Sequence, residues 1–508
     1  MTIRRLRVSK ALLGAAIFAL AAGYLWWIAG DILEVAGDEG IYLEGGRRIV
    51  LGQQPYRDFF VLTGPLTFWI EAILAGFSGM NLPVMRLPLI LDAAFLAWAV
   101  FWFTSRYINA VYSAGTALAF LVYESRIRLL NVNHRWDSGA LATAAIMAAL
   151  VAQRPGRRAL WVLSGALSAA AAWATPSFLI VTLPLLLWSG RQSVRSALAL
   201  VGGGMLITTT AALYLHSHGA LLAMFESLRW TSANYTAANR VTYGSVWAGA
   251  APDVAIWRYL MVTTMEMVPA VLPLAALAGW AWFWRAKDNR ADASEILPLV
   301  AATAALTLAA WPRWTADTLL HTMAIPWFLC AVLFYRLATP RQRFWCCGAV
   351  LLIAATSLAG KVIAPLNYWP RETRVGRLRD PDREGELLEV LERRVQPGES
   401  LFSFPYLPSA YFYLNARNPT RYTFLQPGMM NQEDERRAIE ELWADPPRWV
   451  IYEKFPAEAV FKIWPGSDPA RIPMAAMNGY LTEHYRQVDE VTSPGGHVMV
   501  MQRVSPNP

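Results

Sequence analysis

The sequence predicts a mostly α-helical, polytopic membrane helix bundle of about eleven spans, followed by a soluble C-terminal α/β domain. Three observations predict this fold class. Apolar residues make up 55% of the 508-residue chain and charged residues 16%, whereas soluble domains are about 45–50% apolar and about 25% charged. The apolar residues gather before residue 365 in blocks of about 18–20, the length that crosses a bilayer core. The remaining residues alternate short strand-like and helix-like runs instead.

Each apolar block should be a helix, because backbone groups inside lipid must bond within their own segment. The expected spans are 11–30, 86–104, 107–123, 137–153, 159–174, 177–189, 196–215, 257–284, 295–311, 318–336 and 343–363. We therefore expect a transmembrane domain over 1–365 and an α/β domain over 366–508. Three connecting segments are too long to be simple turns: 31–85, 124–136 and 216–257.

The net charge of +8 reflects membrane topology rather than nucleic-acid binding. Residues 367–508 hold 17 basic and 20 acidic residues, so the positive excess belongs to the membrane part. With the N-terminus inside, short inner loops hold 16 Lys and Arg, and the much longer outer segments hold nine. This bias predicts a cytoplasmic N-terminus and a C-terminal domain outside a bacterial inner membrane.

Smaller elements follow from local patterns. Thr63-Gly64-Pro65 predicts the start of an amphipathic helix over 65–77 that lies in the membrane interface. In the C-terminal domain we expect strands at 401–404, 448–452 and 497–504. Helices are expected there at 384–394, 433–443 and 474–485. This alternation favours a small two- or three-layer sandwich.

Two neighbouring carboxylates, Asp38 and Glu39, follow the first predicted span within Gly37-Asp38-Glu39-Gly40. Carboxylates beside a membrane are costly unless they are solvated or used. One of them can accept a proton from a hydroxyl that attacks an anomeric carbon. Adjacent helical residues point about 100° apart, so only one should be this base. The alternative is that Asp38 caps the helix that starts near Ile41.

A second candidate motif runs from Gln54 to Phe60. Arg57 can clamp a phosphate, and Tyr56 can stack on a sugar. The alternative is an Arg57–Asp58 surface pair that ties the loop, worth under about 1 kcal/mol.

A third group of polar side chains crowds the segment 123–137. Arg126, Arg128 and Arg135 can neutralise a phosphate leaving group. Glu124, His134 and Asp137 can bind a divalent cation, although their spacing is not diagnostic of a metal. The alternative is that the arginines reach lipid headgroups and that Asp137 caps the next helix.

Weaker candidates lie near the tenth span. Arg313 precedes it, and Asp317 and His321 share one helix face. The alternative is helix packing. The sequence contains no Walker loop, zinc-type Cys/His spacing or nucleophile elbow, which disfavours an ATP-driven pump and a serine hydrolase.

The GDEG pair, the QPYRDFF loop leading to Gly64-Pro65, the Thr175-Pro176 turn and the soluble tail together resemble the GT-C glycosyltransferases. The nearest types are protein O-mannosyltransferases and aminoarabinose–lipid A transferases. The resemblance covers mostly residues 1–190 and weakens towards about 340.

This resemblance implies a polyprenyl-phosphate sugar donor, a glycan, lipid or protein acceptor, and an inverting displacement on the outer face. It also implies that Asp38, with Glu39 beside it, is the base, and that Arg57, Arg126 and Arg128 meet the donor phosphate. The family does not decide whether a divalent cation takes part. Membrane lipids are expected partners, and nucleic acid is not.

Two other classes of function compete with this interpretation. A transporter or flippase of a lipid-linked or polar substrate would show internal repeats and charged or broken helices at mid-membrane. The sequence shows no convincing repeat, and its charges cluster at the outer ends. A non-catalytic scaffold would leave the loop carboxylates and arginines without a role.

Overall fold

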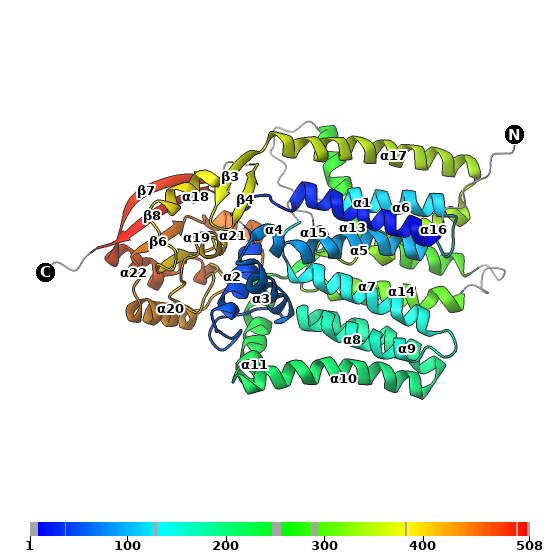
Figure 1. The fold of residues 1–508 in the computed structure, drawn as a ribbon, viewed down its shortest axis with the longest axis horizontal. Coiled ribbons are helices and arrows are strands. Elements are labelled where there is room, and N and C mark those ends of the chain that lie inside the picture. Colours follow the sequence, from blue (N-terminus) through cyan, green and yellow to red (C-terminus); the bar gives the residue numbers. More distant parts are fainter. Residues whose placement is uncertain are drawn as a thin grey trace.

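The computed structural model describes residues 9–35, 37–125, 130–245, 256–285, 293–381, 384–493 and 496–504. Long helices lie side by side in a bundle, and the C-terminal sheet and its helices gather at one end of it (Figure 1). The mostly helical fold with a small C-terminal mixed sheet is as predicted.

A helix stands at every predicted span. The bundle helices are α1 (Lys10–Ala29), α5 (Leu87–Thr104), α6 (Ala110–Glu124), α7 (His134–Ala152), α8 (Ala159–Ala174), α9 (Thr182–Gln192), α10 (Val194–Ser217), α13 (Ile256–Phe283), α14 (Ala293–Ala309), α16 (Ala324–Leu337) and α17 (Pro340–Ile363). By length and composition, four stretches among the described residues can cross a membrane: Lys10–Ala29, Leu82–Thr104, Val194–Ser217 and Pro340–Asn367. The chain is a multi-pass membrane protein, and the number of eleven crossings stays a prediction.

Two predicted spans differ from straight helices. The sixth begins as the 3-10 helix η2 (Pro176–Val181), whose first residue is a proline, before α9 continues it. The tenth is split into α15 (Ala316–Leu320) and α16. The break between them falls at His321, and it allows that side chain to face a cavity rather than lipid.

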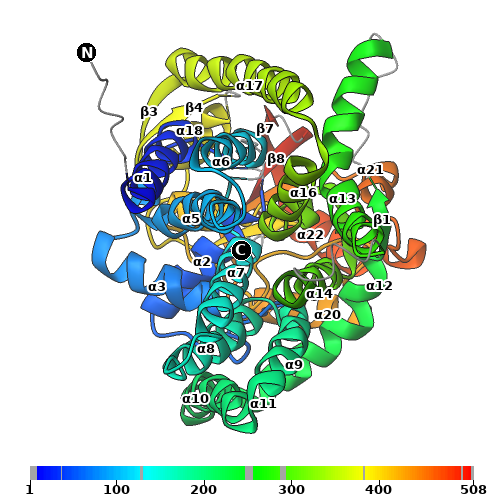
Figure 2. The same cartoon turned by 90° about the vertical axis from the view of Figure 1, so that its right-hand side faces the viewer.

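The bundle packs around one apolar core, and close approaches depend on glycine. A Cβ on Gly165 of α8 would meet the Leu200 carbonyl oxygen of α10 at 1.8 Å, and one on Gly139 of α7 would meet the His321 carbonyl oxygen at 2.2 Å. Small residues let membrane helices approach to backbone contact. The end-on view shows α5 and α7 inside the bundle and α10 and α17 at its edges (Figure 2).

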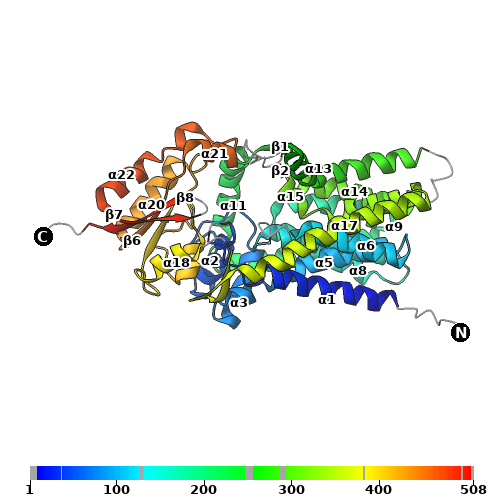
Figure 3. The same ribbon diagram turned by 90° about the horizontal axis from the view of Figure 1, so that it is seen from above.

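The segment after α1 forms α2 (Glu39–Val50), α3 (Leu66–Ser78) and α4 (Leu82–Met85). Viewed from above, α2 and α3 lie between the bundle and the C-terminal elements (Figure 3). The helix α3 starts where Thr63-Gly64-Pro65 predicts. It buries Phe68 and leaves Phe77 87% exposed, as expected of an amphipathic helix.

The C-terminal part is built on a four-stranded mixed sheet of order β5-β6-β8-β7. Its strands are β5 (Leu401–Phe404), β6 (Trp449–Glu453), β7 (Tyr485–Ser493) and β8 (Gly496–Arg503). β5 and β6 are parallel, and the other pairs are antiparallel. The helices are α18 (Gly385–Glu392), α19 (Ser409–Leu414), α20 (Gln432–Ala444), α21 (Ala457–Ile463) and α22 (Ala475–His484).

The remaining elements lie at the junction of the two parts. They are α11 (Leu221–Trp230), η3 (Thr231–Tyr235), α12 (Thr236–Ala238), β1 (Val241–Ser245), β2 (Arg313–Thr315), η5 (Ala364–Asn367), β3 (Trp369–Thr373), β4 (Gly376–Asp380) and η6 (Pro469–Arg471). One apolar core joins this junction to the sheet, because Leu33 and Tyr42 pack in the same cluster as Leu401 and Tyr411.

Candidate functional site

A cavity of about 930 Å³ lies between the end of the bundle and the C-terminal part. Residues of the segments 29–42, 60–68, 130–135 and 313–321 line it, together with Arg86, Tyr235, Asn239, Lys361 and seven residues of the C-terminal part. Most of them lie in loops or at the ends of regular elements, which hold them in place.

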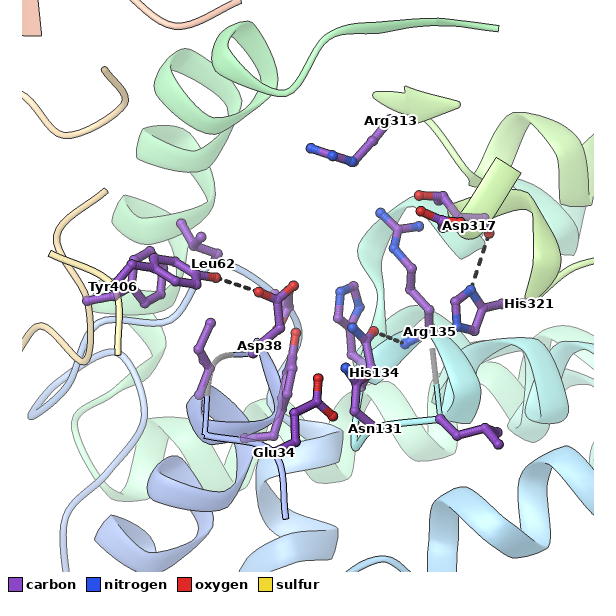
Figure 4. Close-up of a pocket in the computed structure, with 18 of the residues that line it drawn as sticks. Glu34, Asp38, Leu62, Asn131, His134, Arg135, Arg313, Asp317, His321 and Tyr406 are labelled. Atoms are coloured by element: carbon purple, nitrogen blue, oxygen red, sulfur yellow. Dashed lines mark hydrogen bonds between the residues drawn. The ribbon is translucent and has the colours of Figure 1, made fainter. Parts of the chain in front are cut away.

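Asp38 is the residue before α2, and its side chain faces this cavity. Its side chain makes no capping hydrogen bond to the helix. Instead, Asp38 Oδ1 accepts a hydrogen bond of 2.6 Å from the Tyr406 hydroxyl of the C-terminal part, as Figure 4 shows. Burial and the nearby Asp38 raise the pKa of Tyr406 well above its usual value. The phenol therefore stays protonated and is the donor in this hydrogen bond.

Glu39 points the other way and does not line the cavity. It is 1% exposed and forms a bidentate ion pair with Arg86, with Nε–Oε1 at 2.8 Å and Nη2–Oε2 at 2.5 Å. Arg86 also donates to the carbonyls of Ala29 and Ile32. The two neighbouring carboxylates therefore separate into one that faces the cavity and one that holds the end of α1 to α2.

The opposite wall of the cavity holds two arginines and one carboxylate, that of Asp317, so it is cationic overall. Arg135 in the first turn of α7 and Arg313 in β2 both line it, and they lie across the cavity from Asp38 (Figure 4). Arg313 Nη1 donates to Asn239 Oδ1 at 3.1 Å. Burial lowers the pKa of Arg313 from its usual value, but a guanidinium remains charged at neutral pH. The α7 N-terminus adds the positive end of a 19-residue helix to this wall.

Two histidines lie beside these arginines. The His134 ring nitrogen Nδ1 is 2.6 Å from Thr175 Oγ1, and the His321 ring packs edge-on against Trp136 at 4.6 Å. Both line the cavity. Thr175, from the predicted Thr-Pro turn, therefore holds the His134 ring in place.

Of the QPYRDFF residues, only Phe60 lines the cavity, and Gln54 to Phe59 lie outside it. Tyr56 is 2% exposed, and its hydroxyl donates to the Thr63 carbonyl at 2.6 Å. Arg57 pairs with Asp58 at 2.7 Å on the surface and donates to the His218 carbonyl. This geometry corresponds to the loop-tie alternative, and the structure does not bring Tyr56, Arg57 or Asp58 together with Asp38.

Glu124 and Asp137 are buried and do not line the cavity. Asp137 accepts a hydrogen bond from the Thr67 hydroxyl. The carboxylate oxygens of Glu124 have no hydrogen-bond partner among the described residues. Arg126 and Arg128 lie outside the described residues. Within the described part of the chain, no group of three His, Cys, Asp or Glu could hold a metal ion, and the divalent cation stays a prediction.

Several cavity residues were missed by the sequence analysis. Lys361 near the end of α17 lines the cavity and donates to the Val122 carbonyl at 2.6 Å. A lysine at the end of an apolar block is a signal that could have found it. Glu34 also lines the cavity, and burial together with Glu39 and Glu384 raises its pKa to about 8. No local signal points to Tyr406, which is 368 positions from Asp38.

The fold of this chain, a helical bundle with a C-terminal α/β part, is shared by the solved structures of two other proteins. Its fold is similar to that of ArnT from Cupriavidus metallidurans in the apo state, with a TM-score of 0.59 and 13% identity over 98% of this chain and 100% of that one. The same ArnT bound to undecaprenyl phosphate gives a TM-score of 0.56 and 12% identity, covering 97% and 98% of the two chains.

A second protein shares the fold. The Archaeoglobus fulgidus oligosaccharyltransferase tethered to an acceptor peptide gives a TM-score of 0.51 and 11% identity, over 96% of this chain and 74% of that one. Neither a protein-family model nor a curated protein matches the chain. At these identities the likeness establishes the fold, and it confirms the predicted GT-C-like architecture.

Proposed function

We propose that this protein transfers a sugar from a polyprenyl-phosphate donor to an acceptor hydroxyl. The proposal rests on one observation: Asp38 lies on one wall of the cavity, and Arg135 and Arg313 lie on the wall that faces it. One carboxylate facing two guanidinium groups suits a reaction in which the carboxylate accepts a proton and the guanidinium groups stabilise negative charge on the leaving group.

The cationic wall would hold the donor phosphate. Arg135 and Arg313 offer planar donor groups that match phosphate geometry, and the α7 N-terminus adds the positive end of its helix dipole. Polyprenyl phosphate becomes a good leaving group when fixed cations meet its charge as the bond to the sugar breaks. The ArnT structure that contains undecaprenyl phosphate has a similar fold, which supports a lipid phosphate as the leaving group.

Asp38 would act as the general base. The acceptor oxygen attacks the anomeric carbon and passes its proton to the Asp38 carboxylate, while the bond from that carbon to the phosphate oxygen breaks. The products are a glycosylated acceptor and polyprenyl phosphate. A single displacement inverts the anomeric centre. One carboxylate suffices, because a phosphate whose charge is met by fixed cations leaves without a general acid. The Tyr406 hydroxyl, bonded to Asp38 at 2.6 Å, would position that carboxylate.

The charge bias of the loops supports a cavity on the outer face of a bacterial inner membrane. Under this orientation the lipid-linked donor reaches the cavity from the outer leaflet, and the C-terminal part lies outside the cytoplasm.

The test is transfer from labelled polyprenyl-phosphate sugars to membrane acceptors by the purified protein. Asp38→Asn should lower transfer by about 10²–10⁴-fold, the usual contribution of a general base. Asp58→Asn is the matched control, because Asp58 lies outside the cavity, and it should retain full transfer.

Two results would contradict the proposal. Full transfer by a folded Asp38→Asn protein would remove Asp38 as the base. Movement of the donor across vesicles without covalent transfer would favour a flippase instead.

A further inference from the structure

The wall of the cavity beside Asp38 is contributed by the C-terminal part and differs in character from the cationic wall. Tyr406, Phe424, Gln426, Ile463 and Trp464 line it. None of these five side chains carries a charge. The wall combines aromatic faces with one amide, which is the usual make-up of a small-molecule site that orients a neutral polar ligand.

Gln426 lines this wall, and its side-chain amide has an unused hydrogen-bond donor. The residue is 3% exposed. Its Nε2 is buried with no partner among the described residues, and rotation of the terminal amide about its two-fold torsion turns this nitrogen toward the cavity. Its backbone is fixed, since its carbonyl accepts from Met430 N at 3.1 Å and Met429 N at 3.3 Å. Buried polar groups are nearly always satisfied, so an orphan amide in a cavity wall suggests a ligand oxygen.

The aromatic side chains around this amide are held in place by one another. The Tyr406 ring lies 5.1 Å from the Phe424 ring and 5.8 Å from the Trp464 ring, in tilted contacts. The electron-rich face of an aromatic ring attracts positively polarised C–H groups. The C–H groups on one face of a pyranose or furanose ring fit such a surface, while its hydroxyls can meet the amide.

We infer that the acceptor is a neutral sugar residue, bound against this aromatic wall with one of its oxygens accepting from Gln426 Nε2. The inference rests on the proposed function and names its acceptor class. Tyr406 donates a hydrogen bond to Asp38, so a sugar on this wall places a hydroxyl beside the proposed base.

An anionic acceptor group would find no cation among the five side chains, and the arginines of the opposite wall are taken by the donor phosphate. The cavity is also lined by Arg86 and Lys361. However, Arg86 is paired with Glu39, and Lys361 donates to the Val122 carbonyl and Ser125 Oγ.

The test is saturation-transfer NMR with the full-length protein in detergent, using methyl glycosides of common neutral hexoses and pentoses as probes. Undecaprenyl phosphate binding is measured on the same samples. We expect Gln426→Met and Trp464→Leu to weaken glycoside binding roughly five- to tenfold, the loss of about one hydrogen bond or ring contact. Both variants should bind undecaprenyl phosphate as the unaltered protein does.

Matched controls come from the same part of the chain. Gln432 and the 54% exposed Trp443 lie outside the cavity, so Gln432→Met and Trp443→Leu should leave both ligands unaffected. Gln426→Met keeps the side-chain volume and should fold. It therefore still tests the inference if Trp464→Leu does not fold.

The outcomes separate this inference from the proposed function. Undecaprenyl phosphate binding without any glycoside binding would overturn the sugar site. Glycoside binding that neither variant alters would overturn it as well, and so would variant-sensitive binding of a serine peptide in place of the glycosides. Glycoside binding that depends on Gln426, in a protein that does not bind undecaprenyl phosphate, would support the sugar site and reject the proposed donor.

Discussion

Two glutamates near the cavity have different partners. Glu39 meets the Arg86 guanidinium at 2.5 Å, and both side chains are 1% exposed. Glu34 is half-buried. Its burial raises its pKa, and the nearby Glu39 and Glu384 raise it further, with Arg86 only partly compensating them. Its pKa is therefore raised to about 8, and at neutral pH it is a neutral carboxylic acid in the cavity wall.

Replacing Glu34 with glutamine should make stability less dependent on pH. The carboxyl of Glu34 binds its proton more tightly in the folded protein than in the unfolded chain. Its ionisation between pH 4.5 and 8 therefore lowers the stability of the folded state. Glu34→Gln should match the unaltered protein at pH 5 and be more stable by on the order of 1 kcal/mol at pH 9.

The measurement is the melting temperature from pH 5 to 9. The exposed Glu458→Gln is the control and should follow the unaltered protein throughout. Glu34→Gln should also keep its transfer activity at pH 7. Parallel melting curves for Glu34→Gln and the unaltered protein would contradict this assignment.

At the scale of elements, the start of α2 is fixed from two sides. The Glu39–Arg86 pair ties it to the first residues of α5 and, through Ala29 and Ile32, to the end of α1. Gly40 brings it against α19, since a Cβ there would meet Ser409 N at 2.1 Å. Asp38 precedes both residues, so these contacts determine where the proposed base points.

The ion pair is expected to act on stability and not on chemistry. Glu39→Gln and Arg86→Gln should each cost about 3–5 kcal/mol, because each leaves a buried group unpaired. The double variant should cost at least about 1 kcal/mol less than the sum of the two. Denaturant titration measures the free energy of unfolding of the two single variants and the double variant. Additive losses of stability would contradict the pairing of Glu39 with Arg86. Glu39→Gln protein that folds should still transfer sugar.

Substitution of Gly40 should separate α2 from α19. Gly40→Ala forces a methyl group against the Ser409 backbone, and overpacking of this kind costs about 1–3 kcal/mol. It should also reduce transfer, since Asp38 moves relative to Tyr406. Gly76→Ala in α3 is the matched control, because nothing lies within 4 Å of its Cβ; it should stabilise by up to about 1 kcal/mol. Thermal unfolding distinguishes them, and equal effects would refute the close contact.

For the whole molecule, the bundle was predictable because each helix is encoded in one continuous apolar block. Strand β7 was missed because Tyr485–Ser493 is largely polar, and it is a strand through its pairing with β8. The site was predictable only in part. Asp38, His134 and Arg135 stand in polar sequence directly beside predicted spans, which is a local signal. Tyr406 and Gln426 reach the cavity through tertiary packing of the C-terminal part, which no local pattern encodes.

The orientation of the whole molecule gives the last prediction. The predicted inner loops carry 16 basic residues, and loops rich in Lys and Arg stay in the cytoplasm. In a variant without native cysteines, a cysteine at exposed Gln396 should react with a membrane-impermeant maleimide in intact spheroplasts. A cysteine at exposed Arg157, between α7 and α8, should react only after permeabilisation. The reverse pattern would place the cavity on the cytoplasmic side, where a donor on the outer leaflet could not reach it.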